Sequence, residues 1–352
     1  MIGSLLERAE AAAATGLIRL PAPAARMLAG RPIRVEGQQL DVHIQLGLRF
    51  ENLSGASKLR SVAATRARRR RDARTFAGPR IDVARVRDLE LPGPAGPIDA
   101  RLYEPAVLAS PAPLIVYYHG GGHVICDLDT HDQPCRFLAR ETPALLLSID
   151  YRLAPEHRFP AAVDDALAAF RFAHAEADRL GADPGRIAVA GDSAGGNLAA
   201  VVARLAAADG GPRPAFQGLI YPVIDYSSKH PSYETFAEGF FLTRAEMDWF
   251  RDHYFATAAD RSDPRASPIL ADDLSRTPPA HIVTAGFYPL RDEGEAYAAR
   301  LRDAGVAVTL RREPDLVHGF INAVGLGGRS REACKAIAAA IRDGLTAGPD
   351  RM

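Results

Sequence analysis

The chain contains little cysteine. Its 352 residues include three, Cys126, Cys135 and Cys334, an odd number with no C-x-x-C pair among them. Small disulfide-stabilised domains are dense in cysteine, and structural zinc sites use closely spaced cysteine pairs. The sequence therefore argues against both classes and favours a protein that folds in the reducing cytoplasm.

The chain also has no excess of charge of one sign. Lys+Arg and Asp+Glu number 43 each, so no overall field attracts nucleic acid. The basic run 66–74 has no interleaved aromatic residues, and this pattern is more typical of a solvated helix face or surface loop. We therefore expect no nucleic-acid partner.

Long apolar runs are missing as well. No run is long enough to span a bilayer, and the first ten residues carry acids where a signal peptide is basic. We therefore expect a cytoplasmic protein without stable membrane insertion. The sequence leaves the formation of a homodimer open.

What the chain does contain, from residue 81 onward, is an alternation of strand and helix patterns. Strand patterns lie at 83–91, 98–103, 114–118, 144–149, 187–190, 219–224, 281–285 and 306–310. Helical patterns lie at 161–180, 291–304 and 329–347. This alternation predicts an α/β fold, a mostly parallel sheet with helices on both faces and a site at the carboxyl ends of its strands.

Two segments stand apart from this alternation. Residues 1–80 lack strong strand signals and show helical spacing, for example at Leu5, Leu6, Ala9 and Ala13. The segment at about 226–268 is rich in aromatic residues and includes a helical piece at 246–254. An insertion after a sheet strand is interpreted either as a lid over the active-site end or as ordinary core helix.

Ser193 lies in a G-x-S-x-G pattern, residues 191–195. A short apolar strand precedes it and an alanine-rich helix follows, which is the context of a nucleophile elbow. The flanking glycines allow backbone to crowd backbone, and the helix N-terminus favours negative charge. This context favours a nucleophile over a glycine-rich turn that happens to contain a serine.

Candidates for the other parts of an acyl-transfer site are also present. The glycines of the H-G-G-G at 119–122 follow a strand, and their N–H groups can approach a substrate oxygen. We predict an oxyanion hole made by the N–H groups of Gly120, Gly121 and Ala194. His318 lies after the last strand and before the final helix, where the general base is expected.

Four motifs occur in this order along the chain: H-G-G-G at 119–122, D-Y-R-L-A-P-E-H at 150–157, G-D-S-A-G-G at 191–196 and H-G-F at 318–320. With these motifs the sequence resembles the bacterial carboxylesterases of the hormone-sensitive-lipase family, within the α/β-hydrolase fold. The resemblance implies an eight-stranded sheet in a catalytic domain, residues 81–352. It also implies a helical cap, built from residues 1–80 and the insertion, and hydrolysis of short-to-medium acyl esters without a cofactor or metal.

The chain departs from the family pattern at two positions. The residue after H-G-G-G is usually aromatic but here is His123, which predicts a more polar pocket wall. The triad acid begins the family's D-P-L-x-D-E-G, and Tyr288 occupies its position. A phenol cannot stabilise the imidazolium as a carboxylate does. Asp292 is the first choice as a substitute acid; Glu293, Asp315 and a Ser–His dyad without any carboxylate are the alternatives.

The sequence thus predicts a serine carboxylesterase acting on a small-molecule ester, with Ser193 as nucleophile and His318 as base. Two alternatives remain. One is a ligand-binding protein on a hydrolase scaffold, as in plant gibberellin receptors, with little or no turnover. The other is the same chemistry applied to an amide, a lactone or an acetylated sugar, which the elbow does not distinguish.

Overall fold

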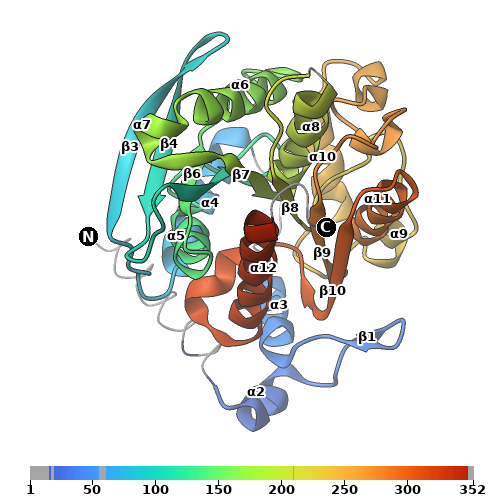
Figure 1. Cartoon of the computed structure of the whole chain (residues 1–352). Coiled ribbons are helices and arrows are strands. Elements are labelled where there is room, and N and C mark those ends of the chain that lie inside the picture. The colour runs from blue at the N-terminus through green and yellow to red at the C-terminus, as the bar shows by residue number, and fades with distance from the viewer. Residues whose placement is uncertain (1–15, 17–19, 55–60, 209, 348–352) are drawn as a thin grey trace.

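The structure, a computed structural model, describes residues 16, 20–54, 61–208 and 210–347. The helical spacing at Leu5, Leu6, Ala9 and Ala13 lies outside these residues. Figure 1 shows the chain from its N-terminal helices, in blue, to its C-terminal helix, in red.

An eight-stranded sheet forms the centre of the molecule. Its strands are β3 (Arg85–Gly93), β4 (Gly96–Glu104), β5 (Ala112–Tyr118), β6 (Leu145–Ile149), β7 (Ala182–Asp192), β8 (Phe216–Ile220), β9 (Ala280–Phe287) and β10 (Val308–Val317). The order is β10-β9-β8-β7-β5-β6-β4-β3, antiparallel at β3–β4 and β4–β6 and parallel elsewhere. The predicted mostly parallel, eight-stranded sheet is confirmed.

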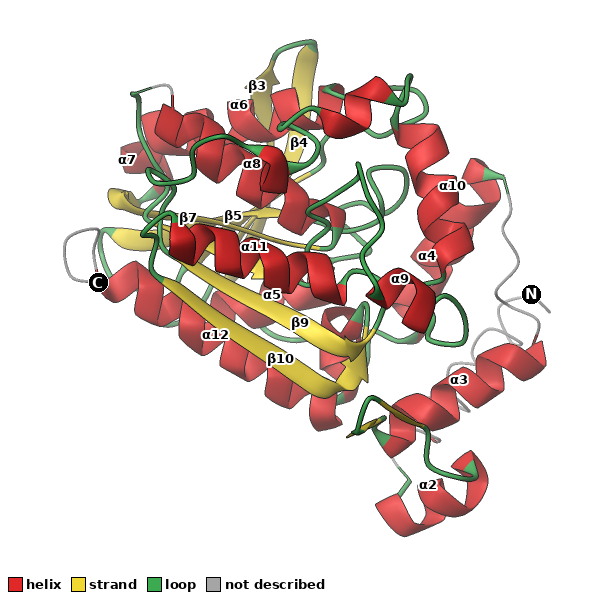
Figure 2. Ribbon diagram, turned by 90° about the vertical axis from the view of Figure 1, so that its right-hand side faces the viewer, coloured by secondary structure: helices red, strands yellow, loops and turns green. Residues whose placement is uncertain are grey.

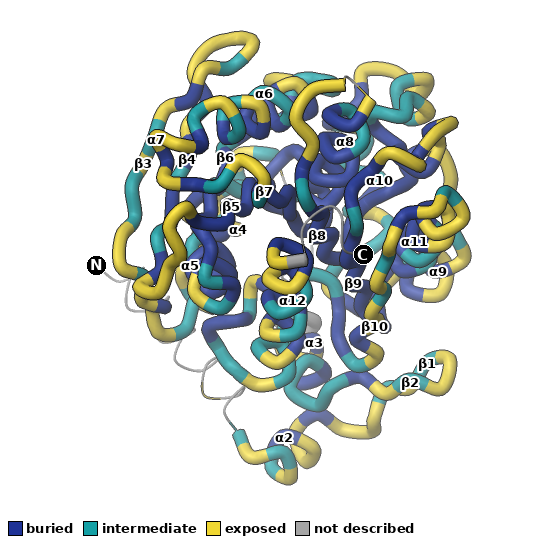
Figure 3. The backbone as a smooth tube through the Cα atoms, viewed as in Figure 1, coloured by how far each residue is buried: buried dark blue, intermediate teal, exposed yellow. Residues whose placement is uncertain are grey.

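Helices cover both faces of this sheet. They are α5 (Asp132–Glu141), α6 (Ala161–Ala175), α7 (Ala177–Leu180), α8 (Ala194–Ala208), α11 (Arg291–Asp303), α12 (Gly328–Ala347) and the 3-10 helix η3 (Phe320–Leu326). In Figure 2, α11 lies on one side of β9 and β10 and α12 on the other. Strands β5 and β6 are buried along their whole length because both faces are covered, and Figure 3 shows this buried centre in dark blue.

The register of the parallel strands brings the predicted site together. Tyr118, the last residue of β5, pairs with Gly191 of β7, and Asp192 pairs with Ile220 of β8. The segments that follow these strands therefore leave the sheet side by side. The H-G-G-G loop and the serine elbow are neighbours because their strands are.

The remaining elements belong to the N-terminal segment and the insertion. They are α2 (Ala22–Ala29), β1 (Arg34–Val35), β2 (Gln38–Gln39), α3 (Val42–Ser54), α4 (Val62–Thr75), α9 (Ser232–Thr235), α10 (Arg244–Tyr254), η1 (Ala259–Ser262) and η2 (Pro268–Leu270). In Figure 2, α3, α4, α9 and α10 lie along one side of the molecule.

Several elements differ from those predicted. The small hairpin β1–β2 has no counterpart in the prediction; Glu36 and Gly37, both with positive φ, form its two-residue turn. Helix α5 was not predicted either. Strand β8 ends at Ile220 rather than at residue 224, because Pro222 cannot donate to a ladder.

Candidate active site

Ser193 occupies a tight turn between β7 and α8. Its φ is +57°, a left-handed conformation uncommon for a residue with a side chain. A Cβ atom at Gly195 would collide with the carbonyl oxygen of Tyr118, so this position has room only for glycine. The turn places the Ser193 hydroxyl at the N-terminal end of α8, as the pattern predicts.

His318 reaches the same point from the end of β10. Its Nε2 lies 2.9 Å from Oγ of Ser193, within hydrogen-bonding distance. Gly319 follows it in a left-handed conformation and immediately precedes η3. Burial lowers the pKa of His318 to about 4, so the imidazole is neutral at neutral pH and able to accept a proton.

The other nitrogen of this imidazole has no such partner. Nδ1 of His318 is buried and makes no hydrogen bond to any residue that the structure describes. The ring of Tyr288 stacks on the imidazole, with centroids 5.5 Å apart, and its own hydroxyl is likewise buried without a partner. The ring of Tyr221 lies against the imidazole at 4.6 Å.

The substitute acids do not supply the missing contact. Asp292 accepts a hydrogen bond from the N–H of Ser232 at 2.9 Å and pairs with Arg291 at 2.8 Å. Asp292 lies in the first turn of α11, and its carboxylate contacts the start of α9. The prediction that Asp292 acts as the acid beside His318 is therefore corrected.

The two other candidate carboxylates are engaged elsewhere as well. One oxygen of Glu293 accepts the N–H of Ile224 at 2.7 Å. Asp315 pairs with Arg329 at 2.8 Å. Neither group makes a hydrogen bond to His318 in the described part of the chain.

The glycine loop provides backbone donors, although not the set predicted. The N–H of Gly120 donates to Oδ1 of Asp192 at 2.9 Å, so it is not free to face an oxyanion. The N–H groups of Gly121, Gly122 and Ala194 make no hydrogen bond to described residues. The carbonyl of Gly121 accepts two N–H groups, from Val124 and Ile125, each at 3.0 Å, and this turns the loop toward the elbow.

Asp192 connects the loop to the elbow, a role that sequence reasoning missed. Besides Gly120, its carboxylate accepts the hydroxyl of Tyr117 at 2.8 Å and lies 3.3 Å from Nε2 of His131. Burial opposes its charge, but His131 and Tyr117 outweigh this and hold the pKa of Asp192 below its usual range. A carboxylate inside the G-x-S-x-G pattern was the available signal.

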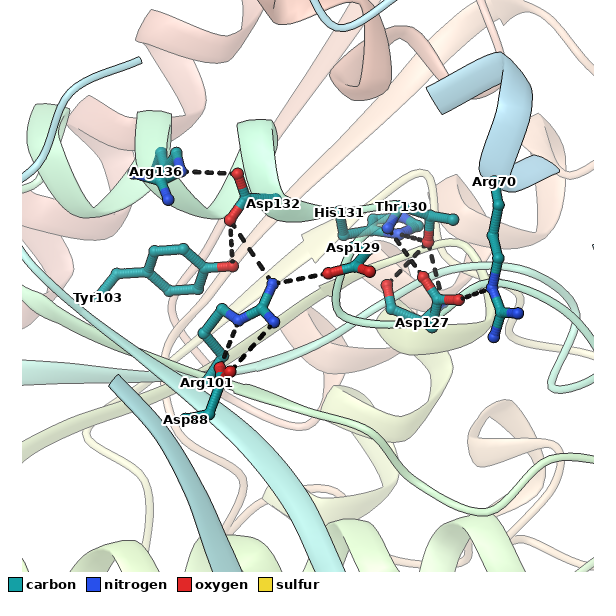
Figure 4. A network of polar contacts seen from close by, with 10 residues as sticks. All are labelled: Arg70, Asp88, Arg101, Tyr103, Asp127, Asp129, Thr130, His131, Asp132 and Arg136. Atoms are coloured by element: carbon teal, nitrogen blue, oxygen red, sulfur yellow. Dashed lines mark hydrogen bonds and ion pairs between the residues drawn. The ribbon is translucent and has the colours of Figure 1, made fainter. Parts of the chain in front are cut away.

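The segment around His131 is itself held by ion pairs, which Figure 4 shows. Arg101 lies between Asp88 at 2.6 Å and Asp129 at 2.9 Å. The hydroxyl of Tyr103 donates to Asp132 at 3.0 Å. These contacts hold Asp129 and Asp132, which lie on either side of His131 in the chain.

The N-terminal helix α4 holds the other end of the glycine loop. Arg66 donates from Nε to the carbonyl of Val124 at 2.8 Å and from a terminal nitrogen to the carbonyl of Ala154 at 2.9 Å. The residue between Gly122 and Val124, His123, stacks on Tyr254 of α10 with centroids 4.0 Å apart. Burial lowers the pKa of His123 to about 3, so this wall is uncharged at neutral pH.

An α/β hydrolase is the class of protein that this sheet and elbow define, and comparison with known proteins agrees. A model of the alpha/beta hydrolase fold matches residues 115–322. The carboxylic ester hydrolase LipN of Mycobacterium tuberculosis is 48% identical over 337 residues, covering 93% of this chain and 89% of LipN. An ethyl acetate hydrolase of Pseudomonas putida is 43% identical over 229 residues, 64% of this chain and 71% of that protein.

Solved structures give the same result. The ester hydrolase EH1AB1 from the metagenome of Lake Arreo, complexed with a bipyridine phosphonate derivative, superposes with a TM-score of 0.83 at 41% identity. That match covers 86% of this chain and 98% of EH1AB1. The chain belongs to the α/β-hydrolase family, in its hormone-sensitive-lipase-like branch, and is a carboxylic ester hydrolase. None of the helices in the described ranges has both the length and the apolar character that a bilayer crossing requires.

Proposed function

We propose that the protein is a serine carboxylesterase that hydrolyses short-to-medium acyl esters through an acyl-enzyme on Ser193. Nε2 of His318 takes the hydroxyl proton as Oγ attacks the ester carbon, and returns it to the departing alcohol. Water, activated by the same imidazole, then releases the acid. The observation that carries this proposal is the 2.9 Å contact between Nε2 and Oγ at a left-handed serine.

The tetrahedral oxyanion is held by the N–H groups of Gly121, Gly122 and Ala194. These donors replace the predicted set, because Gly120 is engaged by Asp192. A side chain at Gly122 would also collide with Phe250 of α10, so the loop lies in contact with that helix. Removing one donor of this kind typically costs ~3 kcal/mol of transition-state stabilisation.

The proposed site is a Ser–His dyad. The rings of Tyr221 and Tyr288 orient the imidazole, but neither supplies a negative charge for the imidazolium that forms. In serine hydrolases the loss of the acid alone lowers kcat by ~10⁴ and leaves substantial catalysis. We therefore expect a slow esterase.

Short acyl groups are favoured by the aromatic surroundings of the loop. His123 and Tyr254 stack beside it, and Phe250 lies against Gly122. The relative whose name gives ethyl acetate as substrate also supports small esters. An amide, a lactone or an acetylated sugar would require the same Ser193–His318 contact. A binding protein without turnover would not, so this contact argues against that alternative.

Three further features belong to this proposal. Residues 1–80 and the insertion at about 226–268 act as a cap, supported by the contacts of α4 and α10 with the loop at 120–124. The protein acts in the cytoplasm on a small-molecule ester, without nucleic acid. Whether it forms a homodimer can be measured by light scattering.

The experiment compares the wild-type protein with Ser193→Ala on 4-nitrophenyl butyrate. We expect the variant to lose at least about 10³-fold in kcat, because it lacks the nucleophile. Thermal melting verifies that the variant is folded. A fluorophosphonate probe should label the wild type and not the variant. Equal rates for two folded proteins would refute the proposal.

A further inference from the structure

The insertion carries a surface cleft whose lining does not include Ser193 or His318. It has a volume of about 270 Å³ and is lined by Tyr226, Ser227, Ser228, Lys229, Arg251, Ala258, Arg261 and Ser262. The charged side chains in this described lining are all cations. A cleft with this lining suits an anion.

Two carboxylates form ion pairs with these three cations. Asp248 lies 3.0 Å from Lys229 and 2.8 Å from Arg251, so one carboxylate serves two cations. Arg261 pairs at 3.3 Å with Asp252, whose side chain is 71% exposed. Exposed pairs of this kind are weak, so Arg261 can exchange its partner for a ligand at little cost.

Two of the lining arginines also carry an Nε–H group without a hydrogen bond to another described residue. The Nε–H groups of Arg251 and Arg261 are buried and make no hydrogen bond to described residues. Asp225, which precedes Tyr226 in the chain, is occupied by its contacts with His230 and the hydroxyls of Ser227 and Ser228. The lining therefore has unused donor capacity, which Asp225 does not fill.

A short segment of backbone joins the cleft to the catalytic serine. The N–H of Val223 donates to the carbonyl of Ser193 at 3.1 Å, and Tyr226, three residues later, lines the cleft. Three residues span at most ~10 Å.

Helix α10 forms a second connection. Its Phe250 lies against Gly122, and the next residue, Arg251, lines the cleft. The ring of Tyr226, which lines the cleft, is 6.2 Å from that of His123, the residue after the glycine loop. The cleft is thus built on two elements, the segment after β8 and helix α10, that also contact the serine elbow and the glycine loop.

We propose that this cleft is a subsite for a carboxylate carried by the ester substrate, which makes acid-bearing esters the preferred substrate class. The inference depends on the esterase activity proposed above. Lys229 and Arg261 bind the carboxylate at the mouth, and the hydroxyl of Ser262 adds a neutral donor. Arg251 contributes charge from a more buried position.

The test compares substrates in which one carboxylate is replaced by a neutral group. For the acyl side, the pair is mono-4-nitrophenyl adipate and its neutral methyl ester. For the alcohol side, the pair is 4-(butanoyloxy)benzoate and 4-(butanoyloxy)benzamide. The readout is the ratio of kcat/KM for the charged substrate to that for the neutral one, measured for each pair.

We expect this ratio to exceed one in the wild type for at least one pair, and to fall about tenfold in Lys229→Gln or Arg261→Gln. Turnover of the neutral substrates should not change in these variants, which also reports that they are folded. Arg276→Gln, an exposed arginine before the amino end of β9, is the matched control and should keep the wild-type ratio. Added NaCl should lower the wild-type ratio.

A ratio of one or less in both pairs for an active wild type would overturn the subsite. So would a loss in the variants that is equal for charged and neutral substrates. Failure of the esterase proposal looks different, because the wild type would then hydrolyse none of the four esters faster than Ser193→Ala.

Discussion

On the serine side of the His318 imidazole, Nε2 meets a hydroxyl at 2.9 Å, and Asp192 beneath the elbow holds Tyr117 and Gly120. On the other side, Nδ1 of His318 is buried without a hydrogen bond to any described residue, and so are the hydroxyl of Tyr288 and Oε2 of Glu293. The two nitrogens of one ring therefore differ, since Nε2 has a partner and Nδ1 has none among the described residues.

This difference separates two tasks that a triad performs together. The elbow side positions the nucleophile and its proton acceptor. The β9–α11 side would normally stabilise the positive charge that the imidazole acquires. In this protein, a hydrogen bond positions the nucleophile against its proton acceptor. For the charge that forms on the imidazole, the described residues provide the aromatic rings of Tyr221 and Tyr288 and no hydrogen-bonded carboxylate. The following predictions test that division, from the largest expected effect to the smallest.

A carboxylate at position 288 should give Nδ1 of His318 the charged partner that it lacks among the described residues. Tyr288→Asp places a negative charge at the acid position of the family, and we expect kcat on 4-nitrophenyl butyrate to rise by about 10- to 100-fold. Tyr288→Asn, whose side chain has the size of aspartate but no charge, is the matched control, and its kcat should not rise. A gain in both variants would assign the effect to lost bulk and not to charge.

Weakening the elbow side should have the opposite effect. Asp192→Ala removes the acceptor for Gly120 and Tyr117, so the glycine loop loses its fixed distance from the serine. We expect kcat to fall by about tenfold or more, with a lower melting temperature. Asp183→Ala, in the exposed first part of the same strand, is the control. Unchanged kcat in folded Asp192→Ala would show that the loop is positioned without it.

The pH profile reports the charge around the imidazole directly. Because burial lowers the pKa of His318 to about 4, the acid limb of kcat/KM in the wild type should lie near pH 4, below the usual range for histidine. A carboxylate in Tyr288→Asp favours the imidazolium and should move this limb up by about one pH unit or more. A limb near pH 6.5 in the wild type would contradict the buried, uncompensated ring.

The smallest effect concerns stability and not rate. Burial raises the pKa of Glu293 to about 8, above its ordinary value of 4.5. The folded state thus holds a proton that the unfolded chain releases, so this contribution to stability is complete below pH 4.5 and is lost as the pH rises to 8.

Glu293→Gln keeps the oxygen that accepts the N–H of Ile224 but cannot ionise. We expect its melting temperature to exceed that of the wild type by about 2–5 °C at pH 8 and to match it at pH 4.5. Equal differences at both pH values would indicate a packing effect unrelated to the proton.

The sequence predicts the parts of this site whose geometry is local. Ser193 was found because a strand, two glycines and a helix start dictate a sharp turn within a few residues. His318 was found because the end of the last strand leads to the same edge of the sheet. The parallel sheet followed from the alternation of patterns, since each apolar run could be buried only between helices.

The sequence does not reveal which distant partner a polar group binds. Gly120 and Gly121 are neighbours of the same type, and only Asp192, 72 residues away, decides which N–H is free. Asp292 is four residues from Tyr288, yet its oxygens serve the N–H of Ser232, 60 residues away. Such pairings depend on how distant elements pack, which spacing alone does not record.

The hold of Arg66 on the carbonyls of Val124 and Ala154 has a practical consequence for anyone shortening this protein. A fragment starting at residue 81 would keep all eight strands of the central sheet, the nucleophile and the base. We expect it to hydrolyse esters poorly even if it folds. The carbonyl of Val124, just after the glycine turn, would face water instead of a guanidinium. In directed evolution, residues 61–75 therefore belong with the active centre and should be varied together with it.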